Sequence, residues 1–196
     1  MLHVRPKPKE RRREANLARI LDAAMGLINE GGFPALSMNR LADRCDYTPG
    51  ALYRYFASKD RLLSALVSRI LDEIQEILSE GVERVPVDRP LARIFALVAS
   101  YRRFAEEQPH KFALIAASFT EPQKLLTSSE SAASVMRATV ETMSPLGDAL
   151  AAAEQAGILT PGSVVDRSLL VFTSTQGVLQ MHKQARVAPN LIDVER

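Results

Sequence analysis

A chain of 196 residues, 46% of them hydrophobic, is long enough for one large domain or two small ones around a packed core. A single cysteine, Cys45, excludes an internal disulfide framework, and no stretch approaches the roughly 18 apolar residues of a membrane helix, so we expect a soluble cytoplasmic protein. The net charge is only +2, but residues 1–61 carry twelve basic and seven acidic residues while residues 62–196 carry thirteen and sixteen, which indicates an anionic partner for the front of the chain.

The chain begins with a basic segment that contains six Lys and Arg residues, one acid and two prolines within residues 1–13. We expect residues 1–13 to form a flexible arm, which either contacts DNA or serves only as a solubilising tail. Apolar residues at spacings of three and four from Leu17 to Ile28 then predict a first helix of about four turns that ends at Gly31 and Gly32.

Three further helix starts follow in quick succession. Ser37, Thr48 and Ser58 each have the side chain of a good N-cap, and Pro49 suits the first position of the helix after Thr48. Only residues 45–47 separate the second helix from the third, and Asp46 in this turn is expected to adopt left-handed backbone angles. A long apolar pattern predicts a fourth helix from Ser58 to about residue 78.

The remaining sequence also predicts helices only. Breaks at residues 85–90, 108–109, 121–122 and 157–162 divide it into helices near 88–107, 109–119, 122–156 and 163–185, and Pro145 either kinks or splits the third of these. No segment alternates apolar and polar residues as a β-strand does, so we predict an all-α fold with an N-terminal three-helix DNA-binding domain and a larger C-terminal helical domain. The expected domains are residues 14–60 and 61–196, after the arm at 1–13.

Two short helices joined by a tight turn and braced by a longer helix form a helix-turn-helix, which places its second helix in the major groove of DNA. With Leu52 facing the core, helical geometry puts Gly50, Ala51 and Arg54 on the outward surface, with Tyr53 and Tyr55 at its edges. Gly50 and Ala51 would let base edges approach, Arg54 would bind guanine or phosphate, and the tyrosine hydroxyls would bind phosphates. The full set of expected DNA-binding residues is Ser37, Arg40, Thr48, Pro49, Gly50, Ala51, Tyr53, Arg54, Tyr55 and Lys59.

These residues resemble the tetracycline-repressor-like (TetR) family of transcriptional regulators. The resemblance covers residues 15–66, and its most specific part is the spacing of Leu52, Tyr53, Phe56 and Lys59; Asp46 departs from the glycine that is usual in the turn. Membership would imply phosphate contacts from Ser37, Tyr53 and Lys59. It would also imply a C-terminal domain that binds a small-molecule effector and forms a homodimer through residues of about 122–156 and 163–185.

The C-terminal part gathers aromatic and sulfur-containing side chains on faces with few charges. An ordinary helical core explains such a pattern, and a pocket for a hydrophobic effector is the alternative. The candidate pocket residues are Phe95, Tyr101, Phe104, Phe112, Phe119, Met136, Met143, Phe172 and Gln176. Val165, Leu169, Phe172 and Gln176 repeat every three or four residues near Gly177, which suggests a helix that faces a partner.

The function expected from these features is a ligand-responsive regulator, a repressor in preference to an activator, that binds a palindromic operator in double-stranded DNA. One short recognition helix reads too few base pairs to select a site among ~10⁶ competitors, so a dimer is expected. His3, His110 and His182 lie in no catalytic or metal motif, and we expect no enzyme activity, metal or cofactor. The alternative is a helical protein-interaction module with a basic surface and no specific DNA target.

Overall fold

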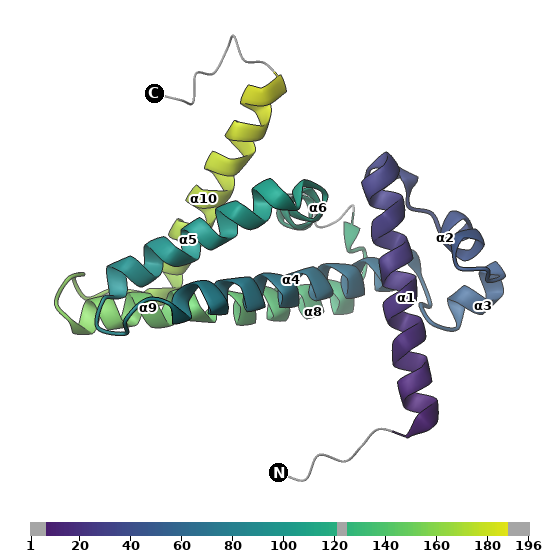
Figure 1. Ribbon diagram of the computed structural model, residues 1–196, viewed down its shortest axis with the longest axis horizontal. Coiled ribbons are helices and arrows are strands. Elements are labelled where there is room, and N and C mark those ends of the chain that lie inside the picture. The colour runs from purple at the N-terminus through teal and green to yellow at the C-terminus, as the bar shows by residue number, and fades with distance from the viewer. Residues whose placement is uncertain (1–6, 121–124, 188–196) are drawn as a thin grey trace. The chain divides into compact units, whose positions relative to one another are not determined.

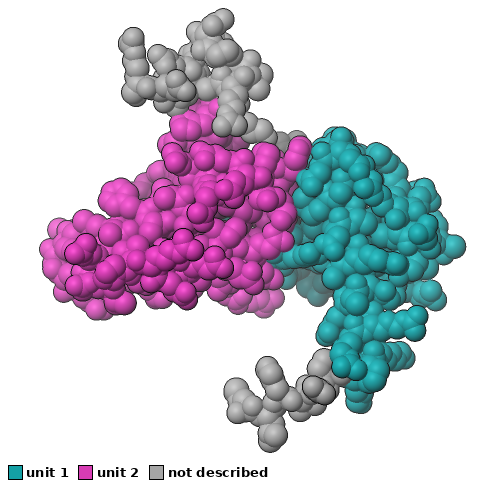
Figure 2. All heavy atoms as spheres, viewed as in Figure 1, with its two compact units in different colours: residues 1–69, 117–135 teal, residues 70–116, 136–196 magenta. Residues whose placement is uncertain are grey.

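The computed structural model describes residues 7–120 and 125–187, and within these residues all regular elements are helices (Figure 1). This confirms the predicted all-α class. The helices form two compact units: the chain up to Arg69 together with Ala117–Val135, and Ile70–Ala116 together with the chain from Met136 onward (Figure 2). The division differs from the expected boundary at residue 60, because the first unit takes in the start of the fourth helix and a distant part of the chain.

The first unit is built around α1 (Pro8–Gly31), followed by a 3₁₀ turn (Phe33–Ala35), α2 (Met38–Arg44), α3 (Pro49–Tyr53) and the beginning of α4 (Lys59–Glu83). The side chains at spacings of three and four in α1 are buried against this short-helix segment, and the innermost of them, Ile20 and Ala24, are fully inaccessible. α1 ends at Gly32, whose φ of 69° lies in the left-handed region that favours glycine. This arrangement is a helix-turn-helix braced by α1.

The predicted flexible arm is wrong for the residues from Pro8 onward, because α1 begins there. Pro8 does not oppose this helix, because at the first helical position its missing N–H is not needed and its fixed φ suits the helix. The backbone N–H of Lys7 also donates to Glu10 Oε2 at 2.7 Å, which satisfies an otherwise free group at the helix start. Residues 1–6 of the expected arm lie outside the described residues.

The three predicted N-caps are confirmed. The hydroxyls of Ser37, Thr48 and Ser58 each accept a hydrogen bond of 3.2 Å from the backbone N–H three residues later. Asp46 has a φ of 56°, so the expected left-handed turn between α2 and α3 is present with aspartate in place of glycine. Local signals in the sequence were therefore sufficient to define the helix-turn-helix.

The second unit contains α5 (Pro90–Glu107), most of α6 (Pro109–Thr120), the end of α8 (Ser129–Thr142), α9 (Ser144–Gln155) and α10 (Val164–Val187). In this unit α5 packs against α9 and α10 (Figure 1). Leu97 and Phe104 of α5 and Leu150 of α9 are buried in the core. The helices predicted at 88–107, 109–119 and 163–185 are confirmed to within a few residues.

Of the two alternatives predicted for the helix at 122–156, the structure shows the split, because α8 and α9 are separate helices that meet at Met143. Pro145 lies in the first turn of α9, and having no N–H, it cannot continue the hydrogen bonds of α8. Residues 121–124 lie outside the described part of the chain. Pro145 therefore splits the predicted helix instead of kinking it.

Candidate nucleic-acid interface

The recognition helix α3 is anchored on one side and free on the other. Leu52 is fully inaccessible and Phe56 is 5% exposed, whereas Tyr53 is 47% exposed. Gly50 and Arg54 are also exposed and Ala51 is partly exposed. Gly50, Ala51, Tyr53 and Arg54 together form what we call the outward surface of α3. The structure thus places these four residues where the helical geometry predicted.

Gly50 is a glycine that the protein's own fold does not require. A Cβ atom built at this position would meet nothing within 4 Å, and Gly50 is not among the residues with positive φ. Glycine within a helix is destabilising by about 0.8–1.0 kcal/mol relative to alanine. Because Gly50 has no side chain, nothing protrudes from the outward surface of α3 at this position, which would allow another molecule to approach the helix backbone closely.

Tyr55 differs from the free edge expected for it. Its side chain is half-buried and stacks on Tyr47 with ring centroids 5.7 Å apart, and its hydroxyl accepts a hydrogen bond of 2.9 Å from the Asn16 amide. Tyr55 therefore ties the end of the recognition segment to α1, and only the proton of its hydroxyl is left to donate to a partner.

α1 also holds the turn of the helix-turn-helix through Arg19. The guanidinium carbon of Arg19 lies 5.2 Å from the centre of the Tyr47 ring, and Nη2 donates to the Cys45 carbonyl at 3.5 Å. Cys45 itself is buried, and burial raises the pKa of its thiol. Neither Asn16 nor Arg19 was recognised from the sequence; Asn16 lies about 40° from the buried Ile20 around α1, whereas Arg19 lies about 100° from it.

Lys59 has an internal reason for its position in the first turn of α4. A cation there is disfavoured by the positive N-terminal end of the helix dipole. The Lys59 ammonium lies 5.0 Å from the centre of the Phe33 ring, an interaction worth ~0.5–1 kcal/mol at exposed sites. The aromatic ring holds this half-buried cation in place without any partner molecule.

Four other expected DNA-binding residues precede Gly50 in the chain. Thr48, Pro49 and Arg40 are exposed and Ser37 is partly exposed. The hydroxyl oxygens of Ser37 and Thr48 accept the capping hydrogen bonds, so their protons remain free to be donated. Arg44 is less available, because it forms two hydrogen bonds of 2.6 and 2.7 Å with Glu30, which lower the pKa of that carboxyl.

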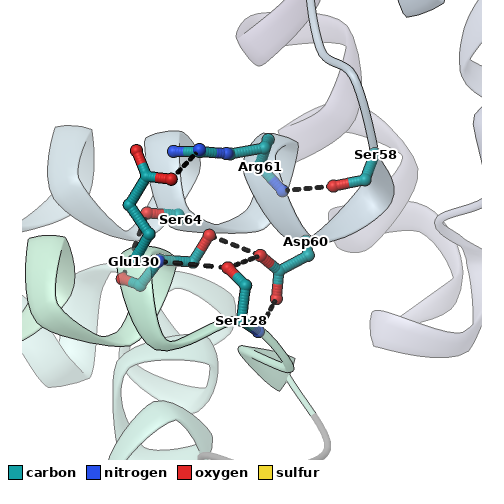
Figure 3. A network of polar contacts seen from close by, with 7 residues as sticks. Ser58, Asp60, Arg61, Ser64, Ser128 and Glu130 are labelled. Atoms are coloured by element: carbon teal, nitrogen blue, oxygen red, sulfur yellow. Dashed lines mark hydrogen bonds and ion pairs between the residues drawn. The ribbon is translucent and has the colours of Figure 1, made fainter.

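Next to Lys59, the carboxylate of Asp60 connects α4 to the start of α8 (Figure 3). It accepts hydrogen bonds from the hydroxyls of Ser131, Ser128 and Thr127 and from the backbone N–H groups of Thr127 and Ser128. Burial opposes ionisation of Asp60, but these hydrogen bonds outweigh it and lower the pKa to about 2. We call this set the Asp60 network; Ser131 within it is completely inaccessible to solvent.

Two further contacts strengthen the same junction. Arg61 of α4 forms an ion pair with Glu130 of α8, and the Ser64 hydroxyl donates to the Ser131 carbonyl at 3.4 Å (Figure 3). The junction joins residues about 70 positions apart in the chain, and all of them belong to the first unit. The first unit thus includes the first turns of α8.

In the second unit, four of the candidate effector residues form an aromatic cluster. Tyr101 lies 6.2 Å from Phe104 and from Phe112 and 6.0 Å from Phe172, measured between ring centres. The Tyr101 hydroxyl and Gln176 Oε1 are buried and have no hydrogen-bond partner among the described residues. Burial raises the pKa of the Tyr101 hydroxyl well above its usual value. Two buried polar atoms of this kind are expected to bind a partner.

The other candidate effector residues do not join this cluster. Phe95 is 71% exposed and Met136 is 59% exposed, so in this structure neither lines an interior. Met143 is half-buried between α8 and α9, and the half-buried Phe119 belongs to the first unit. The second unit also has a cleft of about 340 Å³ lined by Glu73, Ile77, Arg103, Phe104, Glu107, Gln108 and Lys111.

Comparison with known families identifies both parts of the chain. Residues 20–66 match the family described as bacterial regulatory proteins, tetR family, and residues 94–196 match the tetracyclin repressor-like C-terminal domain. The second match alone covers more than half of the 196 residues. The chain belongs to the TetR family.

Individual TetR relatives match in sequence or in fold. The HTH-type transcriptional repressor KstR of Rhodococcus jostii is 39% identical over 101 residues, which are 52% of this chain and 43% of the repressor. The chain matches less than half the length of the KstR proteins of Mycobacterium tuberculosis and Mycolicibacterium smegmatis as well. Among solved structures, AibR in complex with isovaleryl coenzyme A and operator DNA superposes with a TM-score of 0.64 at 21% identity, covering 84% of this chain and 86% of AibR.

A second solved structure supports the same fold. FadR of Bacillus subtilis in complex with stearoyl-CoA has a TM-score of 0.67 at 15% identity, with 90% of each chain covered. Within the described residues, no helix is long and apolar enough to cross a membrane, and no group of three or more His, Cys, Asp or Glu side chains could hold a metal ion.

Proposed function

We propose that the protein is a ligand-responsive transcriptional repressor that binds a palindromic operator as a homodimer and acts in the cytoplasm without catalytic activity. The observation that carries this proposal is the outward surface of α3, which is anchored from behind by Leu52 and open at Gly50. A two-fold dimer would present two such surfaces to successive major grooves. The family to which the chain belongs supports the same reading.

In this proposal the residues around α3 divide into two groups. Gly50, Ala51 and Arg54 approach base edges, with Arg54 placed to bind guanine. The hydroxyls of Ser37, Thr48, Tyr53 and Tyr55 and the charges of Arg40 and Lys59 bind phosphates, while Pro49 contacts the sugar-phosphate backbone as a neighbour of Gly50. The phosphate contacts fix the register of the helix, and the base contacts determine the sequence that is bound.

α10 supplies a surface for the partner protomer, although not the one expected from sequence. In the repeat predicted from sequence, Val165 and Leu169 are exposed, whereas Phe172 and Gln176 are half-buried and Leu179 after them is buried, so only the later part of this side faces the core. At about 100° per residue, a different side of α10 carries Leu170, Ser174, Gly177, Val178 and Met181, all of them exposed. We call this side the α10 stripe.

The α10 stripe has the properties of a helix-packing surface. Leu170 is 66% exposed and Val178, about two turns further along the same side, is 55% exposed. Exposed apolar residues gathered on one side of a helix indicate a surface that another molecule covers. A Cβ atom at Gly177 would meet nothing within 4 Å, so the middle of the stripe is low enough for close helix contact. These features support α10 as the main dimer helix, with parts of the expected range 122–156 beside it.

The effector would be a hydrophobic small molecule bound at the aromatic cluster around Tyr101. Its apolar part would pack on the rings of Phe104, Phe112 and Phe172, and a polar group would bond to the Tyr101 hydroxyl and Gln176. Coenzyme A thioesters are the first compounds to test, because two proteins of the same fold, AibR and FadR, were crystallised with them. To release DNA, the effector must favour the non-binding conformation by a few kcal/mol.

The proposal is tested by selecting duplexes from a random library and measuring their affinity by fluorescence anisotropy. The wild-type protein should bind a selected palindrome at least ~10³-fold more tightly than scrambled DNA. Gly50→Leu should abolish this preference, because its side chain would occupy the base edges, yet it should leave the melting temperature almost unchanged since the site is open. Equal affinity for selected and scrambled duplexes would instead favour the protein-interaction module.

A further inference from the structure

The first two turns of α1 carry an unusual distribution of charge. Residues 7–14 contain five basic and two acidic residues, which leaves a formal charge of +3, and all of them are exposed. The segment is helical and capped by Glu10, so its charges are held in fixed directions. Whether this charge faces the proposed DNA site or simply solvent depends on the side of the helix on which each residue lies.

Asn16 marks the side of α1 that faces the helix-turn-helix, because its amide donates to the Tyr55 hydroxyl. At about 100° per residue, Lys9 lies about 20° from Asn16 around the helix axis, Arg12 about 40° and Arg13 about 60°. The acidic residues Glu10 and Glu14 lie more than about 100° away on the same reckoning. The charges are therefore segregated, with cations toward the helix-turn-helix and acids away from it.

The same side of α1 changes character along its length. From Ile20 onward it carries the buried residues that pack on the short helices, whereas Lys9, Arg12 and Arg13, which we call the basic side of α1, are exposed. At 1.5 Å per residue, these cations lie about 5–10 Å along the axis from Asn16, and so from the end of the recognition segment at Tyr55. Within the described residues, no hydrogen bond or ion pair is formed by these three side chains.

We infer that the basic side of α1 binds backbone phosphates of DNA that flank the groove occupied by α3. This inference rests on the proposed function and extends its interface by about two helical turns. Each strand of duplex DNA carries one phosphate per ~3.4 Å of its axis, and Lys9 and Arg13 lie about 6 Å apart along α1, so the three cations match the sign of the backbone and the spacing of about two successive phosphates. Because the segment is already helical, little ordering of the chain is needed on binding.

The test compares two neighbouring arginines on opposite sides of α1. Arg12→Ala and Arg11→Ala remove the same charge and both insert a good helix former, but Arg11 lies about 140° from Asn16. Affinity for the selected duplex is measured by anisotropy from 50 to 300 mM salt. Arg12→Ala should remove one phosphate contact per protomer and so reduce the magnitude of the negative slope of log K against log salt by about 0.9 per protomer. Arg11→Ala should change this slope much less.

The triple variant Lys9→Ala, Arg12→Ala, Arg13→Ala should reduce the slope by up to about 2.7 per protomer while preserving the preference for selected over scrambled DNA. Circular dichroism confirms that α1 remains helical. Equal changes in the salt slope for Arg11→Ala and Arg12→Ala would overturn the inference, since the total charge of α1 and not the side on which it lies would then determine the affinity. A changed sequence preference would also overturn it, because the residues would then be reading bases. If the wild-type protein binds no duplex selectively, the proposed function itself fails.

Discussion

At the scale of single residues, the two tyrosines that flank Arg54 have different tasks despite their similar positions in the sequence. Tyr53 is 47% exposed, whereas Tyr55 is half-buried, stacked on Tyr47 and hydrogen-bonded to Asn16. Helical geometry placed both at the edges of the outward surface of α3. It could not place the partner of Tyr55, because Asn16 lies 39 residues away in the chain.

Replacement of each tyrosine by phenylalanine should therefore affect different measurements. Tyr53→Phe should weaken binding to selected and scrambled duplexes by a similar factor, about tenfold or more, since a hydrogen bond to a charged phosphate is worth ~1.5–3 kcal/mol, and it should not change stability. Tyr55→Phe should lower the free energy of unfolding by about 1 kcal/mol, because the Asn16 amide loses its acceptor. Urea unfolding and anisotropy on both variants check this, and a stability loss in Tyr53→Phe would contradict the assignment.

At the scale of helices, prediction from sequence succeeded for features set by nearby residues. It failed, or left alternatives open, for features set by distant contacts or by the position of a proline within a helix. The caps at Ser37, Thr48 and Ser58 lie within three residues of their partners, and all were predicted. Residues 1–13 were predicted to form a flexible arm although Pro8 begins α1, and Pro145 left two alternatives open until the structure showed α8 and α9 as separate helices. The spacing of apolar residues predicted the helix α10, but it did not show which of the two apolar sides of this helix is exposed.

The bonds between α4 and α8 were missed for the same reason, because Asp60 and Ser131 are 71 positions apart. Replacement of Asp60 by asparagine should lower the free energy of unfolding at pH 7 by about 1–3 kcal/mol, since the amide cannot accept all the hydrogen bonds of the carboxylate. The folded-state pKa of Asp60 is lowered to about 2 from an ordinary 3.8, so its contribution is fully present above pH 4.

This contribution should disappear as the pH falls from about 4 through about 2, because the carboxyl becomes protonated in the folded protein as well. Urea unfolding of wild type and Asp60→Asn at several pH values should give two curves that converge in acid. The difference between the curves isolates Asp60 from the other carboxylates. A gap that stays constant down to pH 2 would exclude the charged form as the source of stability.

At the scale of the whole molecule, the exposed apolar residues of α10 bear on how many copies of the chain assemble. The stripe that includes Leu170 and Val178 is open, while the side that carries Leu179 is occupied by the protein's own core. The proposed dimer makes the stripe, and not the inward side, the surface between protomers. Two adjacent leucines, Leu169 and Leu170, distinguish these sides, since they are 49% and 66% exposed and lie about 100° apart.

Leu170→Glu should therefore raise the dissociation constant of the dimer at least tenfold, because a charge would be buried in the interface without a partner. Leu169→Glu adds the same charge outside the stripe and should leave the dimer intact. Analytical ultracentrifugation over a range of concentrations measures both. Dissociation by Leu169→Glu alone would assign the interface to the other side of α10 and refute the stripe.

The Asp60 network also bears on how the helix-turn-helix of this chain could be joined to a different C-terminal domain. The match to the family's N-terminal domain ends at residue 66. The Asp60 carboxylate within it nevertheless accepts its hydrogen bonds from hydroxyls and a backbone N–H group of residues 127–131. A graft cut after α4 would remove these donors and leave the carboxylate without the hydrogen bonds that join it to the start of α8. A chimaera should keep residues 117–135 together with the chain up to Arg69, because both segments belong to the first unit.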